Sequence, residues 1–160
     1  RKTGVKIGNN TQVFYDVSFG TEPYLVELGN NVKVTNNVHF VTHDGGTLIL
    51  RKYTPDLEVT APINIGNDIY LGVDTTVMPG VSLGDNVIVG AKSIVTKDVM
   101  PFEVVGGVPA KHIKFRFDIE TQEIILKSKW WQWDLKEFET KKKYFNDVDS
   151  FVEYASTQFE

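Results

Sequence analysis

A six-residue period in the placement of apolar residues is the feature that most constrains how this chain folds. From Ile65 onward, aliphatic residues recur every six positions, and four of these six are followed directly by glycine. A second column of apolar or small residues lies two positions earlier in each hexad, from Ile63 to Val99. Neither a helical period nor simple strand alternation reproduces this spacing. The aliphatic positions are Ile65, Leu71, Val77, Leu83, Val89 and Val95.

This period is typical of the hexapeptide β-helix, an all-β fold of stacked coils. Each hexad supplies a short flat strand and a turn, and three successive hexads close one triangular coil. Like residues then stack above one another, so the aliphatic columns fill the interior. Asparagine and aspartate tolerate the turn dihedrals that the corners require. Such pairs are expected at five corners: Asn9–Asn10, Asn30–Asn31, Asn36–Asn37, Asn67–Asp68 and Asp85–Asn86.

The repeat is interrupted once and then ends. Weaker blocks end at Phe19 and Phe40, and Phe40 lies 25 residues before Ile65, one residue out of phase. We therefore predict an excursion loop at about 44–61, of the kind that carries function when ordered. Beyond the coils we predict two helices, over Asp118–Trp131 and from about 147 to 156. The domains are then 1–116 for the coils and 117–160 for a C-terminal helical cap, with three tryptophans docking a helix on the open end.

Composition excludes several classes of function. The net charge is 17 − 21 = −4, which argues against nucleic-acid binding through a basic surface. There are no cysteines, so disulfides, thiolate metal sites and a cysteine nucleophile are excluded. No apolar run is long enough for membrane insertion, and no secretory signal opens the chain. The chain begins with Arg1 rather than Met, so we expect residues upstream of it. Cytoplasmic localisation is the default expectation.

Histidine is the residue type that best fits acid–base chemistry here. His43 lies where the repeat gives way to the excursion, a junction that can form a cleft wall and place a general base. His39 should point outward from the coil, since Val38 and Phe40 point inward. His112 lies far along the chain. A catalytic zinc ion needs three converging imidazoles, so we expect no metal.

The runs Ile65–Gly72, Val77–Gly84, Gly90–Asp98 and Gly106–Lys111 resemble the hexapeptide-repeat acetyltransferases, which use acetyl-CoA to acetylate hydroxyls or amines. The resemblance is close from about Leu28 to Lys114. The tryptophan-rich tail looks like the xenobiotic-acetyltransferase branch, and His43 before a loop looks like the sugar and capsule O-acetyltransferases. The resemblance implies a left-handed parallel β-helix and a homotrimer with active sites between subunits. Its left-handedness rests on the resemblance alone, because parallel crossovers are generally right-handed.

The resemblance also implies roles for particular residues. His43 matches the general base, and the backbone N–H of Val73 matches a donor to the oxyanion. Tyr70 stands where many members have tryptophan in the wall of the acceptor site. Contacts to acetyl-CoA are implied for Val73, Ala91, Thr96, Lys97, Lys111 and Lys114, with the last two suited to phosphates.

The resemblance predicts direct acetyl transfer from acetyl-CoA to a saccharide or other small-molecule acceptor, in a ternary complex and without a metal. Polysaccharide biosynthesis is the process that fits. The acceptor stays open between a sugar hydroxyl, a sugar amine on a nucleotide sugar, and an antibiotic. A binding or assembly module on the same scaffold is the alternative without catalysis.

Overall fold

The computed structural model describes residues 4–158. Its internal contacts divide the chain into two compact units, Arg1–Arg116 and Phe117–Glu160. The first unit has a core of aliphatic side chains, whereas the second contains a cluster of aromatic rings.

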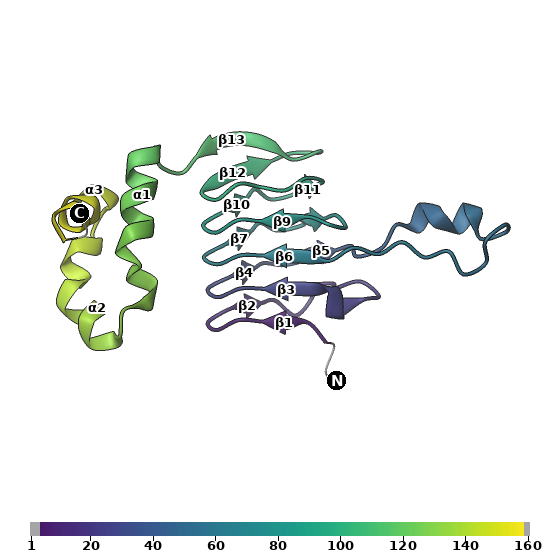
Figure 1. Cartoon of the computed structure of the whole chain (residues 1–160), viewed down its shortest axis with the longest axis horizontal. Helices are drawn as coiled ribbons and strands as arrows, with labels where there is room; N and C mark the ends of the chain where they lie inside the picture. The colour runs from purple at the N-terminus through teal and green to yellow at the C-terminus, as the bar shows by residue number, and fades with distance from the viewer. Residues whose placement is uncertain (1–3, 159–160) are drawn as a thin grey trace. The chain divides into compact units, whose positions relative to one another are not determined.

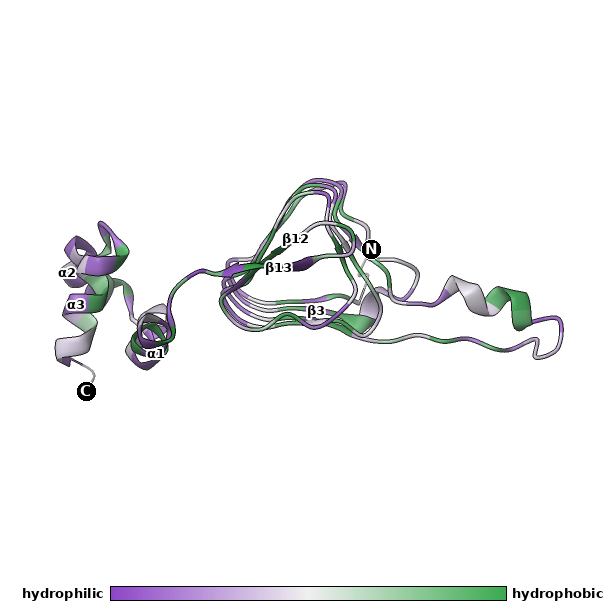
Figure 2. Cartoon of the chain, turned by 90° about the horizontal axis from the view of Figure 1, so that it is seen from above, coloured by the Kyte–Doolittle hydropathy of each residue, from purple (hydrophilic) through white to green (hydrophobic). Residues whose placement is uncertain are grey.

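The first unit is a stack of short strands that form three sheets around a triangular cross-section (Figures 1 and 2). Sheet A consists of β1 (Lys6–Ile7), β3 (Val26–Leu28), β6 (Ile63–Ile65) and β9 (Ser82–Leu83). Sheet B consists of β2 (Gln12–Val13), β4 (Lys33–Val34), β7 (Tyr70–Leu71), β10 (Ile88–Val89), β12 (Glu103–Gly106) and β13 (Lys111–Phe115). Sheet C consists of β5 (His39–Phe40), β8 (Thr76–Val77) and β11 (Ile94–Val95). The chain passes through A, B and C in turn, so each circuit adds one coil.

The strand register follows the hexads. Asn64 pairs with Ser82 in parallel, and 82 − 64 = 18 residues is three hexads. Both predicted columns point inward: Ile63, Ile69, Thr75, Val81 and Val87 are buried, as are Ile65, Leu71, Val77, Leu83 and Val89. The parallel sheets and the separate helical part are as the sequence predicts.

Three corners join the sheets. Corner AB comprises residues 8–11, 29–32, 66–69 and 84–87, and corner BC comprises 14–17, 35–38, 72–75 and 90–93. Corner CA comprises 20–25, 41–62, 78–81 and 96–98. The predicted asparagine and aspartate corners are confirmed at AB and BC, where Asn10, Asn31, Asn37, Asp68 and Asn86 adopt positive φ.

Strand pairing continues after the hexad repeat ends at Met100–Pro101. Strand β12 pairs in parallel with β10 through Ile88–Val104 and Val89–Val105. The chain then reverses, and β13 pairs antiparallel with β12. These two strands were not predicted individually, because β12 keeps an inward residue, Val105, but loses the hexad spacing.

The predicted excursion loop leaves the stack at corner CA and projects away from it (Figure 2). Its two ends pair as a short antiparallel ribbon, in which Asp44 N–H donates to the Val59 carbonyl and Ala61 N–H donates to the Thr42 carbonyl, both at 2.9 Å. A 3₁₀ helix, η2 (Gly45–Leu50), follows, and the Asp44 carboxylate accepts a hydrogen bond from Gly46 N–H at its start. A shorter 3₁₀ turn, η1 (Pro23–Leu25), occupies the same corner one coil earlier.

The second unit contains three α-helices and two 3₁₀ turns within its described residues. These are α1 (Ile119–Ser128), η3 (Trp130–Gln132), α2 (Leu135–Lys141), η4 (Lys142–Phe145) and α3 (Val148–Gln158). The predicted first helix is too long, because Lys129 adopts a left-handed conformation that ends α1. Helix α2 was not predicted.

The tryptophans pack within this second unit. The rings of Trp130 and Trp133 contact Phe145 with centroids 5.5 and 6.0 Å apart, and Trp133 also contacts Phe151. These contacts provide the indoles with partners inside the helical unit. The docking of a helix by tryptophans on the open end of the coils stays a prediction.

Candidate functional site

His43 lies at corner CA, just after β5, where the chain leaves the stack for the excursion. The first two coils are offset by 21 residues, since Ser18 bridges to His39 in parallel and 39 − 18 = 21. The same offset stacks Thr21 against Thr42 and Glu22 against His43. The extra residues in the first coil form η1, which begins directly after Glu22. The coil spacing therefore brings a carboxylate to the imidazole.

Three side chains fix the orientation of the His43 ring. Its Nδ1 lies 3.2 Å from Glu22 Oε2 and 3.1 Å from Thr21 Oγ1. The Thr21 hydroxyl donates to Glu22 Oε1, and the Thr42 hydroxyl donates to Glu22 Oε2 at 2.6 Å. Because the hydrogen of Thr21 is engaged by Glu22, both oxygens near Nδ1 act as acceptors. We therefore assign the tautomer with hydrogen on Nδ1 and a free lone pair on Nε2.

Glu22 is the charged partner of this network. Its side chain is 12% exposed, whereas that of His43 is 41% exposed. Hydrogen bonds from the hydroxyls of Thr21 and Thr42 hold the pKa of Glu22 below its ordinary value, with a smaller contribution from His43. Glu22 is therefore ionised at neutral pH and suited to stabilise a protonated imidazole.

A pocket of about 310 Å³ lies beside His43. Its wall combines Thr21, Glu22 and His43 with the start and end of the excursion loop. Two apolar side chains, Leu48 and Val59, contribute to the lining, as do two charged ones, Arg51 and Glu58. The imidazole therefore borders a space large enough for a small molecule.

The other residues singled out from sequence lie at several places in the first unit. Thr96 and Lys97 are at corner CA, like His43, but two coils further along the stack. Val73 and Ala91 are at corner BC, across sheet C from His43. Tyr70 points outward from β7 in sheet B, and β13 carries Lys111 and Lys114, both exposed. A single chain thus does not bring His43 and Val73 together.

The backbone at corner BC offers donors. Within residues 4–158, neither Val73 N–H nor Ala91 N–H has a hydrogen-bond partner. The two residues belong to successive coils that approach closely, because a Cβ added to Gly72 would lie 2.5 Å from the Ala91 nitrogen. Two adjacent amides at this corner are therefore available to an acceptor atom from outside the chain.

The remaining histidines have structural partners. His39 points outward, as predicted, and its Nε2 lies 3.0 Å from Asn37 Oδ1. His112 Nδ1 lies 2.8 Å from Glu103 Oε1 at the β12–β13 hairpin. Among the described residues, no group of three or more histidine, aspartate or glutamate side chains could hold a metal ion.

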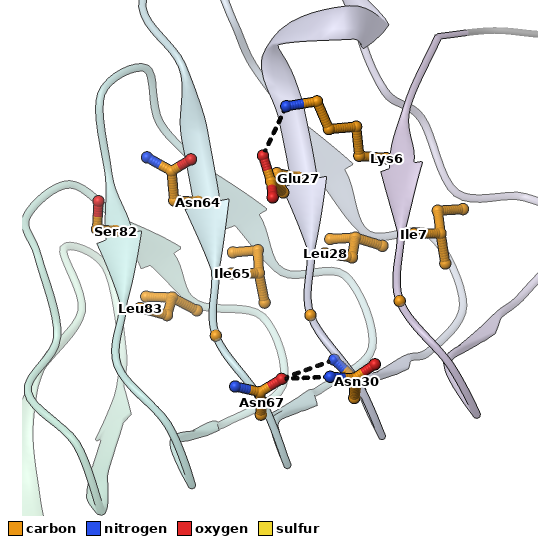
Figure 3. Close-up of a pocket in the computed structure, with 13 residues that line it drawn as sticks. Lys6, Ile7, Glu27, Leu28, Asn30, Asn64, Ile65, Asn67, Ser82 and Leu83 are labelled. Carbon is orange, nitrogen blue, oxygen red and sulfur yellow. Dashed lines mark hydrogen bonds and ion pairs between the residues drawn. The ribbon is translucent and has the colours of Figure 1, made fainter.

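A larger hollow on sheet A is explained by coil stacking. Its volume is about 640 Å³, and it follows the glycines after β1, β3 and β6 together with a ladder of corner amides (Figure 3). Asn30 donates to Asn67 Oδ1 through its backbone and side chain, and Asn67 donates in the same way to Asp85 Oδ1. These amides stabilise the stack, and they give the hollow no set of groups aimed at a ligand.

Glu22, Thr21 and Thr42 are absent from the residues identified by sequence reasoning. They form no local motif, since the carboxylate and the imidazole are 21 residues apart. The signal was nevertheless present in the inward aromatic pair of the first two coils, because Phe19 and Phe40 are also 21 apart and their rings stack at 5.2 Å. Extending that offset by three residues leads from the aromatic pair to Glu22 and His43.

Comparisons with known proteins agree with this fold. Residues 62–97 match a family described as the hexapeptide repeat of succinyl-transferase. Protein CapG of Staphylococcus aureus is 48% identical over 117 residues, which cover 71% of this chain and 67% of that protein. Galactoside O-acetyltransferase of Escherichia coli strain K12 is 36% identical over 70% of this chain and 54% of its own length.

Among solved structures, this chain is similar to a hexapeptide-repeat acetyltransferase from Vibrio cholerae complexed with acetyl coenzyme A. The TM-score is 0.65 and the sequence identity 27%, over 72% of this chain and 62% of that one. The chain spans only about a third of the chloramphenicol acetyltransferases that it matches. No helix within residues 4–158 is long and apolar enough to cross a membrane. With its repeat, its stacked coils and its relatives taken together, the chain belongs to the hexapeptide-repeat acetyltransferase family.

Proposed function

We propose that this chain transfers the acetyl group of acetyl-CoA to a hydroxyl of a sugar or similar small acceptor, with His43 as the general base. The observation that carries the proposal is the orientation of the His43 ring by Thr21 and Glu22. This orientation places a hydrogen on Nδ1 and leaves a lone pair on Nε2, and a pocket lies beside the ring. Family membership supplies the donor, since a structural neighbour is a complex with acetyl coenzyme A.

The chemistry needs orientation and one proton movement. His43 Nε2 removes the proton from the acceptor hydroxyl as its oxygen attacks the thioester carbonyl. Negative charge develops on the carbonyl oxygen, and the unpaired N–H of Val73 is suited to meet it. The carbon–sulfur bond then breaks, and the imidazolium returns the proton to the departing thiolate. Glu22 stabilises the imidazolium and is a positioning residue, since it acts through His43.

The donor contacts are proposed on the same basis. The free Ala91 N–H suits an amide of the pantetheine arm, and Thr96 and Lys97 suit its nucleotide end. Lys111 and Lys114 are exposed on β13, where their charges can meet phosphate groups. Tyr70 is proposed as a wall of the acceptor site, where its ring keeps the shape of the family's tryptophan without the indole N–H.

Assembly completes the proposed site. His43 and Val73 lie at different corners, so the base and the oxyanion donor meet when corner CA of one copy faces corner BC of another. Such a head-to-tail contact closes into a ring, and three copies suit a triangular stack. The coils wind left-handed in this proposal, as the resemblance implies. The exposed Ile49 and Leu50 of the excursion are then available to be covered by a neighbour.

The compartment and the biological process are proposed from the acetyl donor and from the relatives. The cytoplasm is proposed as the compartment, because acetyl-CoA is present there. Galactoside O-acetyltransferase supports a saccharide acceptor, and a role in polysaccharide biosynthesis fits such an acceptor. Chloramphenicol acetyltransferases among the matches keep an antibiotic as the second candidate acceptor.

An acceptor panel tests this function. Purified protein is incubated with acetyl-CoA and neutral sugars, amino sugars or chloramphenicol, and release of free CoA thiol is followed. We expect acceptor-dependent release, reduced about 10²–10⁴-fold by His43→Ala. His39→Ala is the matched control, because His39 is also exposed on the coil, and it should retain wild-type turnover. Equal activity in the two variants, or no acceptor-dependent release at all, would contradict the proposal.

A further inference from the structure

The excursion loop contributes two charged side chains, Arg51 and Glu58, to the pocket that His43 borders. Arg51 Nε donates to the Leu57 carbonyl at 2.9 Å. This bond ties the end of η2 to the returning segment and sets the direction of the guanidinium. Among residues 4–158, the two terminal nitrogens of Arg51 have no partner, and neither carboxylate oxygen of Glu58 accepts a hydrogen bond.

The other charged groups of the pocket are engaged. Both carboxylate oxygens of Glu22 accept hydrogen bonds from threonine hydroxyls. Asp44 Oδ1 accepts from Gly46 N–H and holds this carboxylate at the start of η2. Arg51 and Glu58 are a donor and an acceptor from the two sides of the loop with hydrogen-bonding capacity to spare, beside a base that is oriented for proton removal.

The size and charge of the pocket restrict what fits. The part of the site that one copy provides has a volume of about 310 Å³, which is enough for a single ring. Three carboxylates and one guanidinium line it, so its formal charge is −3 + 1 = −2 with His43 neutral. An anionic ligand would be repelled there.

We propose that Arg51 and Glu58 form the acceptor-recognition subsite and that it takes an uncharged, polyhydroxylated ring. This inference rests on the proposed acetyl transfer and adds its substrate class. Arg51 donates to one ring hydroxyl, Glu58 accepts from another, and Leu48 and Val59 pack against the apolar face of the ring. The hydroxyl that remains is held toward His43 Nε2. The excursion thus selects the acceptor while the coils supply the base.

The test compares a neutral acceptor with an anionic one, in which a carboxylate replaces the hydroxymethyl group at C6. Initial rates are measured with acetyl-CoA and either methyl glucoside or methyl galactoside, whichever the wild type acetylates faster, and with the corresponding methyl uronide. Arg51→Gln and Glu58→Gln are the test variants. Lys52→Gln and Asp56→Asn are matched controls, because they neutralise charges in the same loop at residues that do not line the pocket.

We expect both test variants to raise KM for the neutral glycoside about 10-fold, as when a hydrogen bond to a charged group is lost. The KM for acetyl-CoA and kcat should stay within about twofold of wild type. Glu58→Gln should improve kcat/KM for the uronide relative to the neutral glycoside, and Arg51→Gln should worsen it. The controls should change neither acceptor constant.

The other possible outcomes contradict different parts of the proposal. If the wild type is active but the test variants behave like the controls, the subsite is wrong and the proposed acetyl transfer stands. If the wild type prefers the uronide, the uncharged substrate class is wrong. If the wild type acetylates no acceptor in the wider panel, the proposed function fails and the subsite fails with it.

Discussion

At the scale of single residues, the pairing of Glu22 with His43 shows how the stacking of coils can bring a carboxylate to an imidazole. The imidazole could be identified from sequence because it lies at the one large break in the hexads. Its carboxylate could not be identified from local sequence, because the coil offset alone brings residue 22 beside residue 43. Residues that meet through stacking can be paired from sequence only when the register between coils is known. The three-residue insertion in the first coil obscures that register.

Replacing Glu22 by glutamine removes the charge that stabilises a protonated His43 while keeping the shape of the side chain. We expect kcat to fall at least about 10-fold, since the corresponding change in a serine-protease triad costs about 10⁴. Thr21 Oγ1 remains an acceptor for Nδ1, so the loss should be smaller here. KM for both substrates should change little, and Glu22→Asp should restore part of kcat. A rise in KM with unchanged kcat would show that Glu22 acts on binding instead.

Ionisation of Glu22 also predicts how stability depends on pH. Its pKa is lowered in the folded chain from an ordinary value of 4.5, so its ionised form is favoured by folding. This stabilisation is fully present above pH 4.5 and is lost as the pH falls through the lower, folded-state pKa. Urea unfolding of the wild type should therefore weaken more steeply below pH 4.5 than that of Glu22→Gln. Parallel curves for the two proteins would contradict the assigned hydrogen bonds.

At the scale of elements, the hexads predicted the inward columns and the corners because each coil repeats one local conformation. The same reasoning missed β12 and β13, where pairing to the last coil replaces the periodic signal. It also missed α2, whose start is capped by the Asp134 carboxylate. There the helical unit is held together by contacts between aromatic rings from several segments, which no period encodes.

Glycine after the aliphatic position is required by the distance between coils. A Cβ added to Gly66 would lie 2.5 Å from Asp85 Oδ1 and 3.0 Å from the Leu83 carbonyl oxygen. Gly66→Ala should therefore lower the free energy of unfolding by about 1–3 kcal/mol, as overpacking does. Gly45→Ala is the control, because nothing lies within 4 Å of its added Cβ, and it should stay within about 0.5 kcal/mol of wild type. Equal stability of both variants in urea unfolding would show that the corner absorbs the methyl group.

At the scale of the whole molecule, the proposed catalytic groups are divided between two corners of the triangular stack. The base is at corner CA, and the free amides of Val73 and Ala91 are at corner BC, with sheet C between them. The sequence could not reveal this division, because hexads give the order of the corners but not which corners meet between copies. The proposed active site therefore combines His43 of one copy with Val73 of another.

Subunit complementation measures this requirement most directly. His43→Ala removes the base, and Val73→Pro removes the N–H at a turn position that precedes positive φ at Asp74 and therefore tolerates proline. Asn36→Pro, at the same corner one coil earlier, is the control and should keep wild-type activity. Each test variant alone should lose at least about 10²-fold in turnover. Equal amounts of the two, co-expressed with separate tags and purified through both, provide mixed assemblies.

In a random mixture, a site is intact when one copy supplies His43 and its neighbour supplies Val73, which occurs at about one quarter of the contacts in a closed ring. We expect recovery of roughly that fraction of wild-type turnover, and somewhat more after selection for mixed assemblies. Turnover that stays at the level of the separate variants, in assemblies shown to contain both, would contradict a site shared between copies.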